Sequence, residues 1–235
     1  MVLDKLKADK NNSYIRSSSS RKIVVAFSGP DGTGKTLCAN FIMKYFTLKH
    51  IFTKRVWIKN THTLAYILVR FLEALSPKRV IRSSSGTFFT HSLARSKIWP
   101  WIELVSIIPK LLKIGLESIV FKGKIIFVAD RFLLDTLVHI LMAQRNFNPK
   151  RSLPYMIIAS FLKKYALTIW LDGDPKLLIK RKQPKADPIN YMKFQRLLYF
   201  RVVNLLDIPV VYLNTTNKSS SEMLEEVSSL SLIHI

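Results

Sequence analysis

Short, continuous apolar runs alternate along the chain with longer segments of helical periodicity. The apolar runs are residues 23–27, 55–58, 125–129, 167–171 and 209–213. A continuous apolar run bounded by turn residues is typical of a strand buried on both faces, as in a parallel sheet. The runs therefore predict five parallel strands.

Between these strands, apolar residues recur every three to four positions. This spacing marks residues 37–46, 64–71, 104–116, 155–161 and 191–206. The periodicity predicts amphipathic helices. Alternation of strands and helices is typical of an α/β domain with right-handed crossovers and helices on both faces of the sheet. We therefore predict one α/β domain over residues 22–235.

Two segments lack either pattern. Residues 1–21 are polar, basic and rich in Ser, which favours a flexible extension over a basic arm for an anionic partner. Residues 76–95 are rich in Ser, Thr and basic side chains and are interpreted as a loop or mobile insertion. Its residues Phe88, Phe89 and His91 either line a pocket or, as we favour, pack within the loop.

Composition adds a large positive charge to this picture. The 235 residues include 37 Lys and Arg against 15 Asp and Glu, a net charge of +22, while 49% of residues are apolar. The apolar fraction argues against disorder of the whole chain and suits one folded domain. The charge leaves nucleic acid, an anionic membrane face and phosphorylated small molecules open as partners.

Three further observations bear on the cellular compartment and on whether the chain spans a membrane. The N-terminal residues lack the apolar core of a secretory signal. Charges interrupt every apolar stretch before it reaches the roughly 18 residues of a transmembrane helix. The single cysteine, Cys38, excludes a disulfide framework and suits a reducing compartment. We therefore expect a cytoplasmic protein without a membrane span.

The motif that carries chemistry follows the first predicted strand. Residues 29–36 read Gly-Pro-Asp-Gly-Thr-Gly-Lys-Thr and fit the P-loop (Walker A) pattern G-x-x-x-x-G-K-[ST], with a strand before it and a helix after it. Such a loop curls backbone N–H groups around phosphates, and the helix start adds its positive dipole end. The residues expected in this cradle are Gly29, Asp31, Gly32, Thr33 and Gly34.

The last two residues of the motif predict the cofactor. Lys35 brings a compact charge to the β- and γ-phosphates, and the Thr36 hydroxyl ligates Mg²⁺. Asp130 follows a predicted buried strand, at the same sheet edge as the P-loop, where it is a second candidate metal ligand. We therefore expect ATP and Mg²⁺. The adjacent Arg131 has the planar fork that grips phosphate groups.

A basic cluster follows the fourth predicted strand. Asp174 and Pro175 are typical of a helix start, and that helix runs into Lys180, Arg181 and Lys182, with Lys185 beyond. This cluster is either a lid that folds over the triphosphate or a solvated helix end with favourable dipole interactions. The P-loop upstream favours the lid.

Taken in order, these motifs resemble the thymidylate kinase family of P-loop nucleoside monophosphate kinases. GPDGTGKT is followed by DRF where the family has D-R-Y, and then by LDGDP with Arg181 seven residues after Asp174. The strand PVVYL, an Asn-Thr-Thr sequence and a last helix at residues 222–230 complete the match. The resemblance implies a P-loop NTPase fold with a five-stranded parallel sheet. It also implies transfer of the γ-phosphoryl group of ATP to a deoxynucleoside monophosphate such as dTMP.

The resemblance implies roles for individual residues. Asp31 faces the sugar hydroxyl of the acceptor, Arg131 binds the acceptor phosphate, and Asp130 lies near the metal. A lid around residues 176–190 supplies the catalytic cation, Arg181 with Lys180, Lys182 or Lys185. A phosphate oxygen is already a nucleophile, so catalysis consists of positioning and charge neutralisation.

The acceptor side departs from the family pattern. Residues 59–63 read Lys-Asn-Thr-His-Thr where the family has Arg-Glu-Pro, and Asp135, His139 and Ile140 replace the family's Ser, Tyr and Gln. Asp135 and His139 are therefore candidate substrate-binding residues for an acceptor that stays open. A nucleoside or other small alcohol, with Asp135 or Asp130 as base, is the alternative to a monophosphate.

Two other classes of function remain. The charge and basic tail suit a P-loop ATPase associated with nucleic acid or an anionic membrane. The missing acceptor motifs suit a nucleotide-binding protein without transfer activity. Trp99, Trp101 and the helix after them, with Lys110 and Lys113, have the pattern of a membrane face, but we favour a core or homodimer interface for them.

Overall fold

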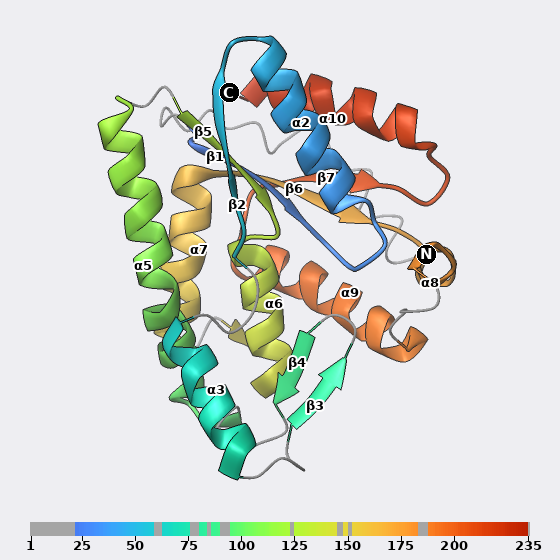
Figure 1. The fold of residues 1–235 in the computed structure, drawn as a ribbon. Helices are drawn as coiled ribbons and strands as arrows, with labels where there is room; N and C mark the ends of the chain where they lie inside the picture. The colour runs from blue at the N-terminus through green and yellow to red at the C-terminus, as the bar shows by residue number, and fades with distance from the viewer. Residues whose placement is uncertain are drawn as a thin grey trace.

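A five-stranded, all-parallel sheet forms the centre of the computed structural model. Its strands are β1 (Val24–Ser28), β2 (Phe52–Val56), β5 (Ile125–Asp130), β6 (Ala166–Asp172) and β7 (Val210–Asn214), in the order β2-β5-β1-β6-β7 (Figure 1). The predicted fold class is confirmed. The structure describes residues 22–58, 63–75, 80–83, 86–89, 95–122, 125–144, 148–149, 152–182 and 188–234, so the predicted extension at residues 1–21 lies outside it.

The burial of each strand explains how well the apolar runs predicted its position. Every residue of β1, β5 and β6 is buried, because each strand has a neighbour on both sides and helices on both faces. The second strand is a correction, since it covers Phe52–Val56 instead of residues 55–58. As an edge strand it pairs only with β5 and is largely exposed, so it tolerates polar residues that hide its start from a hydrophobicity pattern.

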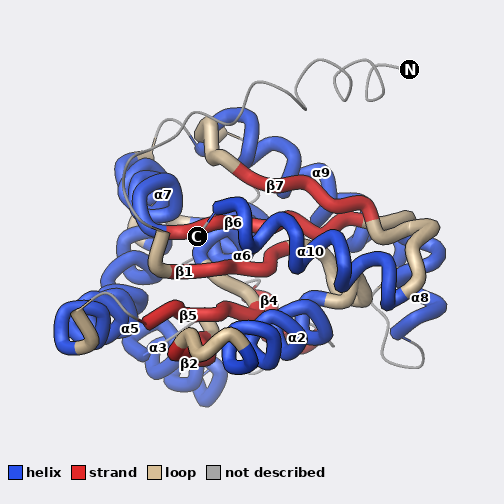
Figure 2. Tube along the Cα trace, turned by 90° about the horizontal axis from the view of Figure 1, so that it is seen from above, coloured by secondary structure: helices blue, strands red, loops and turns tan. Residues whose placement is uncertain are grey.

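Helices cover both faces of the sheet. The helices α2 (Lys35–Leu48) and α10 (Ser220–His234) lie on one face, where they pack with Val25 and Phe27 of β1 (Figure 2). The alternate residues Val24 and Ala26 face the other layer. That layer contains α5 (Trp99–Val120), α6 (Leu133–Gln144), α7 (Leu153–Tyr165) and α9 (Ile189–Leu205), with α3 (Thr63–Leu75) packed on α5.

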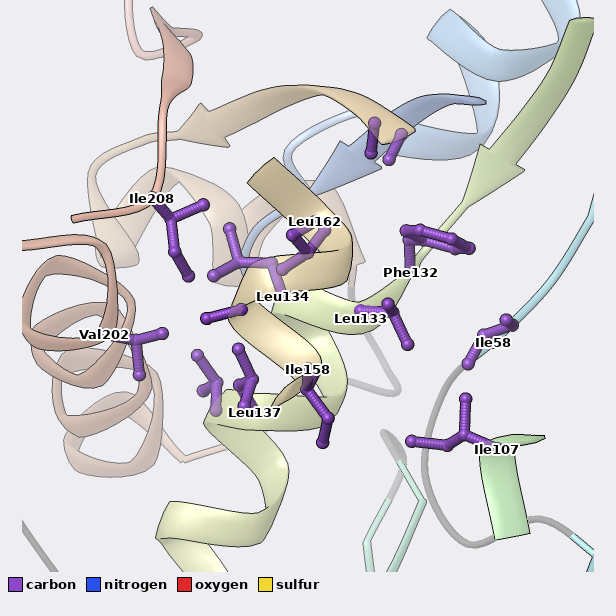
Figure 3. Packing of buried hydrophobic residues seen from close by; sticks show 14 of the residues in the cluster. Ile58, Ile107, Phe132, Leu133, Leu134, Leu137, Ile158, Leu162, Val202 and Ile208 are labelled. Atoms are coloured by element: carbon purple, nitrogen blue, oxygen red, sulfur yellow. The ribbon is translucent and has the colours of Figure 1, made fainter. Parts of the chain in front are cut away.

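The larger core lies between this second layer and the sheet, and α6 is at its centre. Nine of the twelve α6 residues are buried, which leaves the helix without a polar face and explains why helical periodicity missed it. Figure 3 shows α6 side chains packed among those of the neighbouring elements: Ile58, Ile107, Phe132, Leu133, Leu134, Leu137, Ile158, Leu162, Val202 and Ile208.

Two further sequence expectations are tested by the fold. Within residues 76–95, interpreted as a loop, β3 (Val80–Ser83) and β4 (Gly86–Phe89) form an antiparallel two-stranded sheet.

Cys38 is fully buried on α2, and burial raises its pKa to about 12, so it is a core residue and not a reactive thiol. Among the described helices, none has the length and apolar character to cross a membrane.

One buried acid has no compensating contact. Glu103 of α5 is completely buried, and neither of its carboxylate oxygens has a hydrogen-bond partner among the described residues. Burial raises the pKa of Glu103 to about 8. Burial, together with the charge of Glu103, also raises the pKa of Tyr155 on α7.

We predict that Glu103 makes the fold less stable as the pH rises. Its usual pKa of 4.5 applies to the unfolded chain, so between about pH 4.5 and 8 the folded protein binds one more proton than the unfolded one. The free energy of unfolding therefore falls by a few kcal/mol across this window. Glu103→Gln is expected to remove that dependence in urea unfolding measured from pH 5 to pH 9.

The matched control is Glu117→Gln on the same helix, where the carboxylate pairs with Lys54 at 2.6 Å. Its urea midpoint should keep the pH dependence of the wild type. An identical pH profile for wild type and Glu103→Gln would contradict the prediction.

Candidate phosphate-binding site

The P-loop leaves the central strand through a turn that excludes side chains. Gly29 has a φ of 143°, and a Cβ at this position would lie 2.0 Å from the Leu171 carbonyl oxygen of β6. Gly32 has a φ of 86°, and a Cβ there would lie 2.8 Å from the Leu178 carbonyl oxygen of α8 (Pro175–Lys182). Both positions require glycine, because an L side chain is both strained at this φ and in collision with backbone.

The first turn of α2 brings Lys35 and Thr36 to the carboxyl edge of the sheet. The Lys35 ammonium is buried and donates to the Pro30 carbonyl oxygen at 2.5 Å. The Thr36 hydroxyl donates to Oδ2 of Asp130 at 2.6 Å. The structure thus places the two predicted metal ligands in direct contact, although they are 94 residues apart in sequence.

A third side chain contacts Asp130, and no pattern in the sequence indicated it. Arg55 of β2 lies 3.2 Å from the same Asp130 oxygen and donates to Asn40 of α2 at 3.1 Å. The parallel register of β2 beside β5 brings Arg55 to this edge, and the shift in the predicted strand obscured it. Arg55 therefore partly neutralises the candidate metal ligand.

Asp31, the one acid of the P-loop motif, contacts several cations. It forms ion pairs with Arg131 and with Lys182 at the end of α8, and the Lys35 ammonium lies 3.8 Å from its Oδ1. Three cations from three different segments therefore converge on one buried carboxylate. This arrangement concentrates positive charge beside the P-loop, where phosphate groups bind in proteins with this motif.

The backbone of Arg131 is strained. Its φ is 78°, a left-handed conformation that residues other than glycine rarely adopt. Two backbone bonds fix it, from Arg131 N–H to the Phe27 carbonyl at 3.0 Å and from Ile58 N–H to the Arg131 carbonyl at 3.2 Å. Strain of this kind clusters at functional sites. This backbone conformation directs the Arg131 guanidinium toward Asp31, and one guanidinium nitrogen lies 3.7 Å from Asp135.

The structure places Asp135 in the interior, as a junction between three segments. Its Oδ1 accepts the Tyr199 hydroxyl of α9 at 2.7 Å and lies 3.5 Å from the Gly29 backbone nitrogen. Its Oδ2 accepts the Phe132 N–H at 3.2 Å, which caps the start of α6. Burial and the Asp135 charge raise the pKa of Tyr199. His139 follows one turn later on α6 and is half-buried.

The predicted lid residues separate in the structure. Lys182 contacts the P-loop, whereas Arg181 donates to the Thr215 carbonyl at 3.0 Å, beyond β7. Arg181, the expected catalytic cation, thus contacts the segment after β7 while its neighbour Lys182 contacts Asp31, because adjacent residues of a helix point in directions about 100° apart. Lys180 is exposed on α8, and Lys185 lies outside the described residues.

A second buried acid supports this edge of the sheet and was also missed. Asp172, at the end of β6, pairs with Arg196 of α9, whose Nε lies 2.8 Å from each carboxylate oxygen, and accepts the Tyr212 hydroxyl at 2.9 Å. The Asp172 carbonyl accepts the Thr215 N–H at 2.8 Å. This network fixes the segment that Arg181 contacts.

Comparison with known proteins finds a similar structure and no similar sequence. No protein-family model matches the chain, and no curated protein sequence matches it. Among solved structures, the thymidylate kinase of Candida albicans, reported for its broad substrate specificity, is similar with a TM-score of 0.59 and 13% sequence identity. The match covers 92% of this chain and 93% of that one. The protein therefore has the P-loop NTPase fold found in thymidylate kinase.

We predict that the contact of Tyr199 with Asp135 stabilises the P-loop turn. Tyr199→Phe removes the donor and leaves a buried carboxylate with one partner fewer, which should cost about 1–3 kcal/mol of unfolding free energy. Urea unfolding of Tyr199→Phe, Asp135→Ala and the double variant measures the coupling of the two side chains. Tyr66→Phe is the matched control, because Tyr66 is exposed on α3. Additive losses in the double variant would show that the contact contributes nothing.

Proposed function

We propose that the protein is an ATP-dependent phosphotransferase of the nucleoside monophosphate kinase type. In this proposal it moves the γ-phosphoryl group of ATP·Mg²⁺ to a (deoxy)nucleoside monophosphate such as dTMP. The observation that carries the proposal is the contact of Thr36 with Asp130 beside the P-loop, with Arg131 adjoining the same edge. It supports a site for a metal-bound nucleotide with an arginine on the acceptor side.

The residues present fit ATP and Mg²⁺. The close backbone approach at Gly29 and Gly32 leaves the N–H groups of the loop uncovered by side chains of those residues, as a phosphate cradle requires. A threonine hydroxyl and a carboxylate oxygen are ligands of the kind that Mg²⁺ binds, and Thr36 and Asp130 are 2.6 Å apart. When bound, ATP·Mg²⁺ supplies the phosphoryl group and a divalent charge next to it.

Positioning and charge are the contributions of this chain in the proposal. Lys35 leaves its carbonyl contact to bind the β- and γ-phosphates, and Lys182 of α8 brings a second cation over the loop. Arg131 holds the acceptor phosphate with its planar fork. Asp31 orients both Arg131 and Lys182 through its ion pairs.

The choice between acceptors depends on the two candidate bases, Asp130 and Asp135, because an alcohol acceptor requires a base. Asp130 contacts Thr36 and Arg55, and both Asp135 oxygens accept hydrogen bonds from Tyr199 and Phe132 in the interior. This arrangement favours a monophosphate, whose oxygen needs no base. The broad substrate specificity reported for the Candida albicans kinase makes a panel of monophosphates the appropriate assay.

We predict that Lys35→Ala lowers phosphoryl transfer by about 100-fold or more, because the variant loses the charge that follows the transferring group. The measurement is ADP release with ATP, Mg²⁺ and each monophosphate or nucleoside of a panel. Lys44→Ala, at an exposed position of the same helix, is the control and should keep full activity. A folded, ATP-binding wild type that no acceptor stimulates would overturn the proposal and favour a nucleotide-binding protein.

We also predict that Lys182→Ala lowers kcat more than Arg181→Ala does. Lys182 contacts the P-loop, and loss of its charge should reduce kcat by about 10-fold or more. Arg181→Ala instead loses contacts to the segment after β7, which should lower unfolding free energy by about 1 kcal/mol. Lys180→Ala controls for the general charge of α8. A larger kcat loss in Arg181→Ala than in Lys182→Ala would show that Arg181 is the lid cation.

A further inference from the structure

The side chain of Arg55 connects β5 and α2 at the metal side of the candidate site. One guanidinium nitrogen lies 3.2 Å from Oδ2 of Asp130, and the other donates to the Asn40 amide oxygen at 3.1 Å. Asn40 and Thr36 are four residues apart, so they lie on the same side of α2. The guanidinium therefore lies beside the hydroxyl and the carboxylate that we propose as Mg²⁺ ligands.

A single oxygen of Asp130 is shared by two donors. Oδ2 accepts the Thr36 hydroxyl at 2.6 Å and is also the atom that Arg55 contacts. A divalent cation on this oxygen would lie next to the guanidinium. The Asp130 side chain is only 10% exposed, so water screens the repulsion between the two cations weakly. Arg55 is therefore a competitor of a metal ion for Asp130.

The position of β2 allows Arg55 to leave this contact. β2 is an edge strand of the five-stranded sheet, and the Arg55 side chain is 45% exposed. The guanidinium can move into solvent without a rearrangement of the core. Its planar set of donors also matches phosphate oxygens, so a nucleotide phosphate held beside Thr36 would offer it another anionic partner.

We propose that Arg55 makes metal binding at Asp130 depend on the nucleotide. This inference rests on the ATP·Mg²⁺ site proposed above. Arg55 keeps its ion pair with Asp130 against a metal ion alone, which therefore binds weakly. Arg55 releases Asp130 when the metal arrives with ATP, because the phosphates attract both the metal and the guanidinium. The alternative is a fixed role, in which Arg55 only ties the edge strand to α2.

The first test measures metal binding by the full chain without nucleotide. Mn²⁺ is the probe, because it takes the same oxygen ligands as Mg²⁺ and its free concentration is read by electron paramagnetic resonance. Arg55→Leu should bind Mn²⁺ about 10-fold or more tightly than the wild type, because the competing charge is removed. Arg55→Lys keeps the charge and should stay close to the wild type.

Two further variants control this test. Lys44→Leu removes an exposed cation of α2, so its net charge equals that of Arg55→Leu, and it should bind Mn²⁺ like the wild type. Asp130→Asn, added to Arg55→Leu, should abolish the gain in Mn²⁺ affinity. Circular dichroism of each variant confirms that it is folded.

The second test measures the coupling between metal and nucleotide. The affinity for a fluorescent ATP analogue is measured over a range of Mg²⁺ concentrations, with no acceptor present. In the wild type Mg²⁺ and the analogue should each strengthen binding of the other. In Arg55→Leu this mutual enhancement should fall by about 10-fold, because the metal no longer needs the phosphates to displace a competing cation.

Three results would overturn the inference. Unchanged Mn²⁺ affinity in Arg55→Leu would leave Arg55 with the fixed role, and weaker Mn²⁺ binding would show that it positions Asp130 for the metal. A gain that survives Asp130→Asn would place the ion elsewhere. Failure of the proposed function has a different result. A chain that shows the expected metal and nucleotide coupling, but transfers phosphoryl to no acceptor, would contradict the phosphotransferase proposal and support the role of Arg55.

Discussion

Gly29 leaves the central strand where a side chain would meet the Leu171 carbonyl oxygen at 2.0 Å, and this contact determines where the P-loop lies. The turn therefore begins against the backbone of β6, and Asp135 and Tyr199 contact Gly29 from the helices α6 and α9. Lys35 and Thr36 follow at once, so the same turn sets their distance from Asp130. The positions of Lys35 and Thr36 thus depend on backbone packing in the buried part of the sheet.

Part of the net charge of +22 has a defined place in this fold. Around the P-loop, Lys35, Arg131 and Lys182 contact a single carboxylate, Asp31. Such convergence of cations is unfavourable unless negative charge compensates it. In the structure Asp31 provides part of that compensation, and nucleotide phosphates would provide more.

The sequence predicted the features that depend on local pattern. The buried strands β1, β5 and β6, and a P-loop placed between strand and helix, are of this kind. The edge strand β2 and the enclosed helix α6 were misplaced or missed, because neither has the contrast between apolar and polar faces that a pattern detects. The roles of Arg55, Tyr199 and Arg196 come from contacts between residues distant in sequence. No local spacing reports such contacts in a single sequence.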